Sequence, residues 1–479
     1  MVGREKEIRE LNNLYNSGKP ELVVIYGRRR VGKTYLVDEV FRNRITFSHA
    51  GMSPIEGEEA GSLRRQLDHF LLSLQIQGMG RVAKPKSWLE AFNLLEKYLQ
   101  EIDNGSRQVV FLDELPWMDT PRSGFITAFE AFWNSWACHR KNLMVVVCGS
   151  ANAWILDKLI NNHGGLYGRV THEIKLLPFS LSECEQFFSE SGIQLSRYDI
   201  VQSYMACGGI PYYLHYFTQG LSAAQNIDQL FFVRNARLAN EYERLFQSAF
   251  DQAGLENRIV ELLYRKNAGY TRNEIICQLK VNDGGAINGA LRALLAGDFV
   301  EKYTPFGMSK KEVHYKLIDP FCLFYLCFVK ERADQNENFW SENQTLQAVV
   351  SWRGIAFENV CFNHVPQIKQ ALGVAGVVSE QSAWSKKEDD REGTQIDLLI
   401  QRNDNVVNMC EMKFYSGAFS VTKDYWHKIM HRVELLSSKI SPKMVVHSTL
   451  VTTYGLEQNE YSGAFVKVIT LKELFAKMA

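Results

Sequence analysis

A glycine-rich segment near the amino end of the chain has the residues that a phosphate-binding loop requires. It begins at Gly27, ends in Gly32, Lys33 and Thr34, and follows the apolar run Leu22–Tyr26. Glycine permits backbone angles that turn amide N–H groups toward phosphate oxygens, and the helix that follows presents its positive end there. Lysine reaches the β- and γ-phosphates, and the threonine hydroxyl is a ligand of Mg²⁺. The segment predicts a nucleotide site formed by Gly27, Arg28, Arg29, Arg30, Val31, Gly32, Lys33, Thr34 and Tyr35.

Two adjacent carboxylates complement this loop. Asp113 and Glu114 come directly after the apolar run Val109–Leu112, which has the composition of a buried parallel strand. Because parallel strands end at one edge of their sheet, we expect both carboxylates beside the phosphate loop. Asp113 is the candidate ligand of Mg²⁺, and Glu114 is the candidate for orienting the attacking water. Together with Lys33 they predict hydrolysis of a nucleoside triphosphate.

Two more polar residues of this region are open to two interpretations each. Ser150 follows the apolar run Leu143–Cys148 and is either a sensor of the γ-phosphate or an ordinary turn residue. Arg169 lies in the segment Leu166–Thr171. It is either a finger that neutralises charge on the transferred phosphate, within one chain or between chains, or a surface arginine.

Three charged residues near the carboxyl end indicate a second site. Asp397 lies in the strand-like run Thr394–Ile400, and Glu411 and Lys413 end the run Val406–Lys413. If a three-residue turn at 403–405 joins the runs as an antiparallel hairpin, Asp397 faces Glu411 with about 5 Å between their Cβ atoms. Side chains alternate along a strand, so Glu411 and Lys413 share one face of it. The apolar Cys410 and Met412 lie on the other face, which is expected to be buried.

Facing carboxylates of this kind predict a Mg²⁺ site, which Mn²⁺ could also occupy. The metal would polarise a phosphate and activate water, and Lys413 would position that water or stabilise charge. Glu358, in a helix predicted near Trp352–Val365, could complete the metal shell. An ion-paired hairpin is the alternative for the same residues, since an E-x-K triplet is common: Glu173 to Lys175 forms another one.

The elements that carry these residues belong to the α/β class. Residues 1–175 alternate buried strands with helical patterns, and 176–250 are mostly helical. Residues 255–318 predict three helices and a hairpin, in which Thr271 caps Arg272–Leu279 and Asn288 and Arg292 point outward from the third helix. A polar stretch, Gln335–Thr345, is expected to be a linker to a mixed α and β region at 345–479.

Length and charge set limits on the functions to be considered. With 479 residues the chain should hold three or four domains. Its 54 basic and 54 acidic residues give no net charge, which argues against coating nucleic acid by bulk electrostatics. Nine cysteines without a CxxC pair favour reduced thiols in a cytoplasmic protein, and no apolar stretch approaches the length of a membrane span.

As a set, these motifs resemble the archaeal and bacterial P-loop ATPases of the AAA+/STAND group. The resemblance covers roughly residues 1–250 and includes Val2–Glu7, the phosphate loop, Leu112–Glu114, Tyr167–Arg169 and Gly208–Pro211. It implies that ATP is bound, that Val2, Gly3 and Arg4 lie near the base and ribose, and that Pro211 lies against the adenine. It also implies a P-loop core over 1–175, a helical lid over 176–250 and a winged helix-turn-helix over 251–330. Related ATPases act as monomeric switches or as homo-oligomeric rings.

The region 345–479 is similar to the PD-(D/E)xK nuclease core, of the restriction-endonuclease-like α/β fold. That resemblance implies that Glu358, Asp397, Glu411 and Lys413 form a metal-dependent nuclease site, with Lys423 and Tyr425 as auxiliary residues. No glutamine occupies the usual auxiliary position. A degenerate nuclease fold that only binds remains the alternative.

Two functions follow from the sequence. In the first, ATP hydrolysis moves the lid and winged helix and so controls DNA cleavage at the carboxyl-terminal site. In the second, the ATPase is a regulatory switch whose carboxyl-terminal domain only binds nucleic acid or protein. For the winged helix, DNA contact and an intramolecular clamp are both open. A nuclease that acts on RNA is a third possibility.

Overall fold

The computed structural model describes most of the chain, namely residues 2–53, 62–161, 164–249, 253–308, 312–332, 336–388 and 391–478. Side chains are outside this description at 62, 248–249, 253, 385–388, 391–395 and 397. The chain forms two compact units that divide between Leu177 and Pro178. The first unit contains the phosphate loop, and the second contains the carboxyl-terminal cluster.

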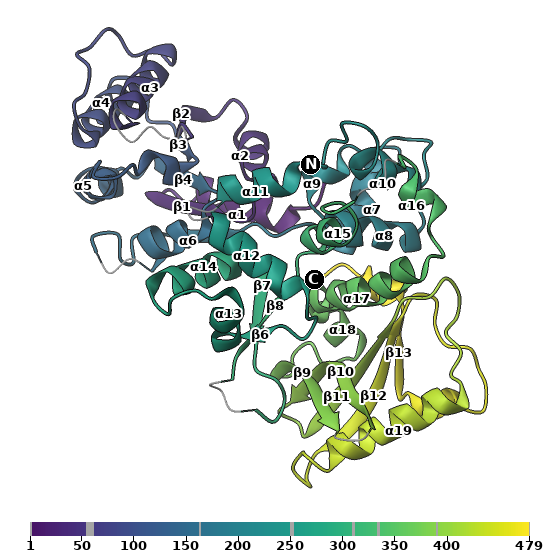
Figure 1. Cartoon of the computed structure of the whole chain (residues 1–479). Coiled ribbons are helices and arrows are strands. Elements are labelled where there is room, and N and C mark those ends of the chain that lie inside the picture. The colour runs from purple at the N-terminus through teal and green to yellow at the C-terminus, as the bar shows by residue number, and fades with distance from the viewer. Residues whose placement is uncertain are drawn as a thin grey trace. The chain divides into compact units, whose positions relative to one another are not determined.

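The first unit is built on a parallel five-stranded sheet (Figure 1). The strand order is β2-β3-β4-β1-β5, so β4 separates the strand before the phosphate loop from the strand before the carboxylates. The strands are β1 (Glu21–Tyr26), β2 (Ile45–Ala50), β3 (Gln108–Asp113), β4 (Leu143–Gly149) and β5 (His172–Lys175). The predicted α/β class and its three buried strands are confirmed. The edge strands β2 and β5 were not predicted, because polar residues interrupt both.

Aromatic side chains fill the core on one face of this sheet. Trp88 and Phe92 pack with Phe125 and Phe129, at ring-centroid distances from 4.9 to 6.2 Å. They come from two amphipathic helices, and burying such large rings is the main stabilisation of the layer. The helices of the unit are α1 (Glu5–Tyr15), α2 (Lys33–Phe41), α3 (Ser62–Ile76), α4 (Trp88–Glu101), α5 (Phe125–Ser135) and α6 (Asn152–Ile155).

The second unit opens with helices, as predicted for 176–250. They are α7 (Leu181–Glu190), α8 (Arg197–Cys207), α9 (Pro211–Leu214), α10 (Ala223–Phe231) and α11 (Glu241–Ala249). Ser180 begins α7 with a capping box: it accepts from the Glu183 amide while the Glu183 carboxylate accepts from the Ser180 amide. Gly208, in the left-handed region at φ 70°, ends α8.

Three helices and a small antiparallel sheet follow. They are α12 (Ala253–Tyr264), α13 (Arg272–Leu279) and α14 (Gly285–Ala296), with β6 (Tyr270–Thr271), β7 (Val300–Tyr303) and β8 (His314–Leu317) in the order β6-β8-β7. Thr271 caps α13 as predicted, and Asn288 and Arg292 are exposed on α14. Lys310 and Lys311, the basic residues expected in the wing, lie outside the described residues.

The predicted linker at 335–345 is wrong for its described part. Residues 336–345 contain α16 (Phe339–Glu342), and Trp340 is only 1% exposed. It packs against Phe324 and Phe328 of α15 (Pro320–Phe328), and Asp228 accepts hydrogen bonds from the amides of Trp340 and Ser341. The segment therefore packs into the second unit through its buried tryptophan, even though its composition is polar and rich in asparagine.

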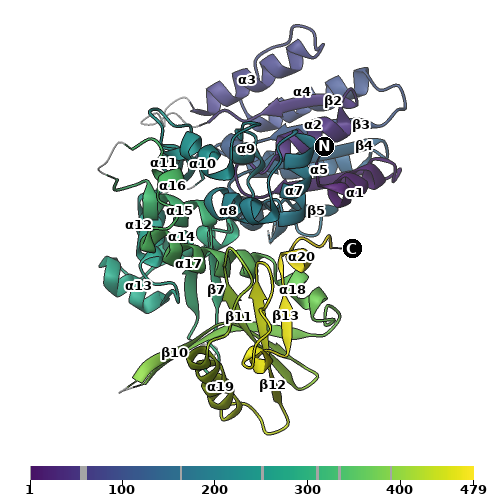
Figure 2. The same ribbon diagram turned by 90° about the vertical axis from the view of Figure 1, so that its right-hand side faces the viewer.

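The carboxyl-terminal region is a mixed sheet in the order β13-β12-β11-β10-β9, with α19 along one side (Figure 2). Its helices are α17 (Gln347–Asn363), α18 (Val365–Ala371), α19 (Lys423–Ser437) and α20 (Leu471–Leu474). Its strands are β9 (Ser379–Glu388), β10 (Arg391–Arg402), β11 (Val406–Lys413), β12 (Val445–Thr452) and β13 (Lys467–Ile469).

The predicted hairpin register is confirmed where β10 and β11 are paired. Leu398 lies opposite Cys410 and Leu399 opposite Met409, which is the pairing that a turn at 403–405 requires. Cys410 and Met412 are buried, as expected for that face. None of the described helices combines the length and apolar character that crossing a bilayer requires.

Candidate functional site

The phosphate loop depends on one glycine for steric reasons and on another for its backbone angle. A Cβ atom at Gly27 would lie 2.2 Å from the carbonyl oxygen of Leu176, far inside a van der Waals contact. Gly32, which precedes α2, has φ 92°, in the left-handed region, and open space around its Cα. The loop backbone therefore approaches the residue after β5 at Gly27 and turns into the helix at Gly32.

Lys33 lies inside the loop with its ammonium group turned toward backbone oxygens. Its Nζ donates to the carbonyl oxygens of Gly27 at 3.0 Å and Arg28 at 3.1 Å, and the residue is 6% exposed. Burial lowers the pKa of Lys33, and the nearby Glu114 and Asp113 partly oppose this shift. Carbonyl oxygens thus hold the ammonium where phosphate oxygens could replace them.

Thr34 and Asp113 meet as predicted, although β4 lies between their strands. The Thr34 hydroxyl donates to Asp113 Oδ2 at 2.7 Å, and Asp113 Oδ1 accepts from the amide of Glu114 at 2.9 Å. A hydroxyl and a carboxylate oxygen this close are ligands of the type that Mg²⁺ prefers. The oxygen donors and the buried Lys33 fit a magnesium-bound triphosphate.

Ser150 lies between the loop and the carboxylates because its strand, β4, is the central one. Its hydroxyl is 3.1 and 2.9 Å from the two oxygens of Glu114, and its amide is 3.2 Å from Glu114 Oε2. Glu114 itself has φ 44°, a left-handed conformation that costs a side-chain-bearing residue energy. Ser150 therefore holds the carboxylate of Glu114 in place, and its role as a γ-phosphate sensor stays a prediction.

Sequence reasoning missed Asn152, which fixes the start of the loop. The Gly27 amide donates to Asn152 Oδ1 at 2.9 Å, and both residues are buried. Asn152 follows Ser150 by two residues, just past the end of a buried strand, and this position could have indicated a role at the phosphate loop.

The remaining residues assigned to the nucleotide site are distributed more widely. Arg4 is buried and donates to the carbonyl oxygens of Leu177 at 2.7 Å and Val31 at 3.3 Å, so it ties the chain's start to the loop. Arg28 is buried, the Arg29 guanidinium lies 5.9 Å from the Trp117 ring centre, and Tyr35 is exposed. The placement of Val2, Gly3, Arg4 and Pro211 around the base stays a prediction.

Arg169 is not brought to the phosphate loop by any described interaction. It lies in an exposed turn, where its amide bonds to the carbonyl of Leu166. Within the described part of the chain, its guanidinium has no hydrogen bond or ion pair. Its role as a charge-neutralising finger, within one chain or between chains, stays a prediction.

In the carboxyl-terminal cluster, Glu411 is fully buried and already paired. Arg432 Nη1 lies 2.5 Å from Glu411 Oε1, and the Tyr425 hydroxyl donates to Oε2 at 3.0 Å. Lys413 Nζ is 3.9 Å from the same Oε2, as the shared strand face predicted. Tyr425 therefore contacts Glu411, and its auxiliary role stays a prediction, as does that of Lys423. Arg432, seven residues later on α19, was not foreseen.

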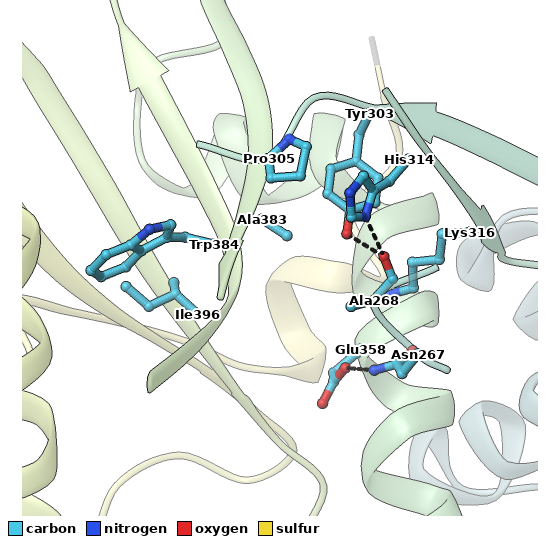
Figure 3. Close-up of a pocket in the computed structure, with 10 residues that line it drawn as sticks. All are labelled: Asn267, Ala268, Tyr303, Pro305, His314, Lys316, Glu358, Ala383, Trp384 and Ile396. Carbon is cyan, nitrogen blue, oxygen red and sulfur yellow. Dashed lines mark hydrogen bonds between the residues drawn. The ribbon is translucent and has the colours of Figure 1, made fainter. Parts of the chain in front are cut away.

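Glu358 belongs to the same electrostatic neighbourhood and lines a pocket (Figure 3). Its pKa is raised by burial, while Lys316, a hydrogen bond from Asn267 and Lys413 act to lower it. Asn267 Nδ2 donates to Glu358 Oε2 at 2.8 Å. The pocket lies between the α12–β8 segment and strands β9 and β10, and its wall includes Tyr303, His314, Lys316, Ala383, Trp384 and Ile396.

The side chain of Asp397 lies outside the described residues, so its predicted approach to Glu411 is not tested. Its backbone lies in β10, where the pairing with β9 shifts by one residue between Ile396 and Leu399. Bulges of this kind re-aim side chains and are frequent beside active sites. Among the side chains that are described, no three His, Cys, Asp or Glu gather in a metal-binding group. Glu411, with both oxygens engaged, does not offer a cation site in this arrangement.

Comparison with known proteins agrees with the geometry of the first unit. Residues 1–217 match a family described as an ATPase domain predominantly from Archaea. An uncharacterised protein of Methanocaldococcus jannaschii is 23% identical over 419 residues, which is 86% of this chain and 87% of that protein. An uncharacterised ATP-binding protein of the same organism is 42% identical over 43 residues, 9% of this chain and 73% of the relative.

Solved structures show more distant likenesses. A Walker-type ATPase of Pyrococcus abyssi is 20% identical, with 68% of this chain and 96% of that chain covered and a TM-score of 0.45. The ORC2 protein of Aeropyrum pernix is 14% identical, with 68% and 93% covered and a TM-score of 0.37. The family match and the loop geometry agree: residues 1–217 of this chain are similar to an ATPase domain found predominantly in Archaea.

Proposed function

We propose that the chain is a molecular switch that binds and hydrolyses ATP with Lys33, Thr34, Asp113 and Glu114. The observation that carries the proposal is the 2.7 Å contact between the Thr34 hydroxyl and Asp113, with the Lys33 ammonium held inside the same loop. These groups come from two segments about 80 residues apart, yet they meet at one edge of the sheet, where α/β proteins bind phosphates.

Each residue has a separate task. Lys33 binds and neutralises phosphate oxygens, and Thr34 and Asp113 hold the metal. When bound, Mg²⁺ and ATP supply a γ-phosphorus made electrophilic by charge neutralisation. Glu114 orients the attacking water or takes its proton, and Ser150 keeps its carboxylate aimed. Arg169 acts from its exposed turn on a site in a second copy, which would make the active form a homo-oligomer.

The test is ATP turnover by the full chain with Mg²⁺. Lys33→Ala and Asp113→Asn are each expected to lower the turnover by about 100-fold or more, because each removes charge stabilisation in a buried site. Lys141→Ala, at an exposed lysine of the same unit, is the matched control and should leave the rate unchanged. Full turnover by Lys33→Ala would contradict the proposal.

We propose metal-dependent cleavage of DNA by the carboxyl-terminal domain as a second candidate function. The β10–β11 register supports it, because the same register continued by one residue would place Asp397 opposite Glu411, and Lys413 lies beside Glu411. The engaged state of Glu411 favours the alternative, a domain that binds nucleic acid or protein without cutting. Helix α14, with Asn288 and Arg292 exposed, is the proposed DNA contact of the middle region, the alternative being an intramolecular clamp.

The two outcomes separate in a plasmid-nicking assay with Mn²⁺ and ATP. Nicking that is lost in Asp397→Ala, Lys413→Ala and Lys33→Ala would support a nuclease coupled to ATP. Nicking that is lost only in the first two would support a nuclease without coupling. Intact plasmid under every condition would leave the ATP-driven binding switch, and RNA in place of plasmid tests the remaining substrate class.

A further inference from the structure

Groups of the chain itself balance the charge of Glu411 inside the protein. Its side chain is 1% exposed, and a buried carboxylate is tolerated only when it is paired and hydrogen-bonded. Arg432 supplies the close positive charge, at 2.5 Å, and Tyr425 supplies a donor to the other oxygen. Each carboxylate oxygen therefore accepts a hydrogen bond from helix α19.

Arg432 lies closer to Glu411 than Lys413 does, and it is the cation that donates a hydrogen bond to the carboxylate. The Lys413 ammonium is farther from the carboxylate, at 3.9 Å, and its side chain is 30% exposed, so water can hydrate it. The Arg432 side chain is 21% exposed and donates directly to Oε1. Charge-assisted hydrogen bonds of this geometry are among the strongest in proteins.

Resting on the second candidate function, we propose that Arg432 occupies the place of the metal ion at Glu411 and competes with it. A divalent cation that coordinates Glu411 would meet the guanidinium at the same oxygen, and both charges are positive. Binding of the metal then requires Arg432 to move away. Arg432 is thus a positioning residue. It stabilises the buried Glu411 and prevents a metal from binding there until Arg432 is displaced.

Glu358 supports the same view of a closed site. Its Oε2 accepts from Asn267, a residue of the segment before β6, and the pocket beside it is walled by that segment. Both described carboxylates of the cluster are therefore held by the chain's own donors, one from α19 and one from the middle region.

The test measures Mn²⁺ binding by the full chain without nucleotide, from the free-ion signal in electron paramagnetic resonance. Removing Arg432 by Arg432→Gln deletes a charge-assisted hydrogen bond, so we expect Mn²⁺ to bind at least about tenfold more tightly than in the wild type. The double variant Arg432→Gln, Glu411→Gln should lose this gain, which shows that the added affinity is at Glu411. The control is Arg402→Gln, which breaks the ion pair with Asp404 in the same domain and should bind Mn²⁺ like the wild type.

Stability gives a second readout. Without metal, Arg432→Gln leaves Glu411 buried without its cation, and we expect Tm to fall by about 5 °C or more, with recovery in millimolar Mn²⁺. If that variant does not fold, Arg432→Lys keeps the positive charge and should fold and bind Mn²⁺ as weakly as the wild type. Tight Mn²⁺ binding by Arg432→Lys would then contradict the proposal.

Equal Mn²⁺ affinity of the wild type and Arg432→Gln, or no binding that depends on Glu411 in either, would overturn the role of Arg432. DNA cleavage is not the readout. A chain that binds Mn²⁺ as expected but never nicks plasmid would lose the nuclease function and keep the competition between Arg432 and metal.

Discussion

His364 should make the second unit lose stability in mild acid. The ring is 1% exposed and follows directly on α17. Its Nδ1 lies 2.7 Å from the carbonyl oxygen of Val360, and its Nε2 lies 3.0 Å from the amide of Leu181 at the start of α7. The carbonyl can only accept and the amide can only donate, so the neutral ring with its proton on Nδ1 is the form that satisfies both.

The magnitude follows from the pKa. Burial lowers the pKa of His364 from 6.5 to about 4. The unfolded chain thus takes up a proton near pH 6.5, and the folded chain does so only near pH 4. Stability from the neutral ring is present above pH 6.5 and is lost as the pH falls toward 4. At about 1.4 kcal/mol per pKa unit, the full loss is about 3 kcal/mol.

The assay is urea unfolding between about pH 7.5 and about pH 4.5, where about 2.5 kcal/mol of this loss should appear. His364→Gln removes the titrating group and the ring contact with Tyr204, so it should be less stable at neutral pH. Its stability should then fall less steeply in acid, and the two curves should converge. Burial lowers the pKa of His49, in the first unit, to about 3. The variant His49→Gln is therefore the control that measures the acid sensitivity of the first unit. Parallel pH profiles for the wild type and His364→Gln would refute the reasoning.

Three more predictions concern the phosphate loop. Gly27→Ala, whose Cβ would lie 2.2 Å from Leu176 O, should lower the unfolding free energy of the nucleotide-free chain by about 3 kcal/mol. Gly32→Ala, with open space but φ 92°, should lower it by only about 1 kcal/mol, and equal losses in urea titrations would contradict the assigned contact. Ser150→Ala should reduce kcat for ATP about tenfold with little change in KM, because Glu114 loses its hydroxyl donor and keeps only the backbone amide of residue 150; an unchanged kcat would rule this out. Asn152→Ala should raise the Kd for ATP about tenfold because the Gly27 amide loses its acceptor, and Asn152→Asp, which keeps an oxygen there, should lose less in the same titration.

The sequence was most informative where chemistry and local pattern coincide. Thr34 and Asp113 were expected to meet because each follows a buried parallel strand, and they do. The pairing of Leu398 with Cys410 followed from a short turn and alternating side chains, both of which are local properties. The capping role of Thr271 had the same local origin.

Contacts between distant segments could not be read in this way. Arg432 reaches Glu411 from 21 residues away and Asn267 reaches Glu358 from 91 residues away, and neither residue type is distinctive in its own helix or loop. Trp340 became a core residue because two other helices provide aromatic partners for it, whereas the segment around it is polar apart from Phe339. Such contacts are set by the packing of elements, which periodicity does not encode.

The contacts of the second unit bear on how a switch could act on the carboxyl-terminal site. Tyr198 of α8 stacks on Phe414, the residue after Lys413, with ring centroids 4.6 Å apart. Asn267 holds Glu358 from the middle region. The site is thus touched by a helix of the proposed lid on one side and by the proposed winged helix on the other. Because packed aromatic rings and hydrogen-bonded carboxylates have discrete arrangements, a shift of either element must break one of these contacts before it can leave the site. Each of these two contacts can be removed by a single substitution, Tyr198→Ala or Asn267→Ala, which tests whether it couples the helices to the site.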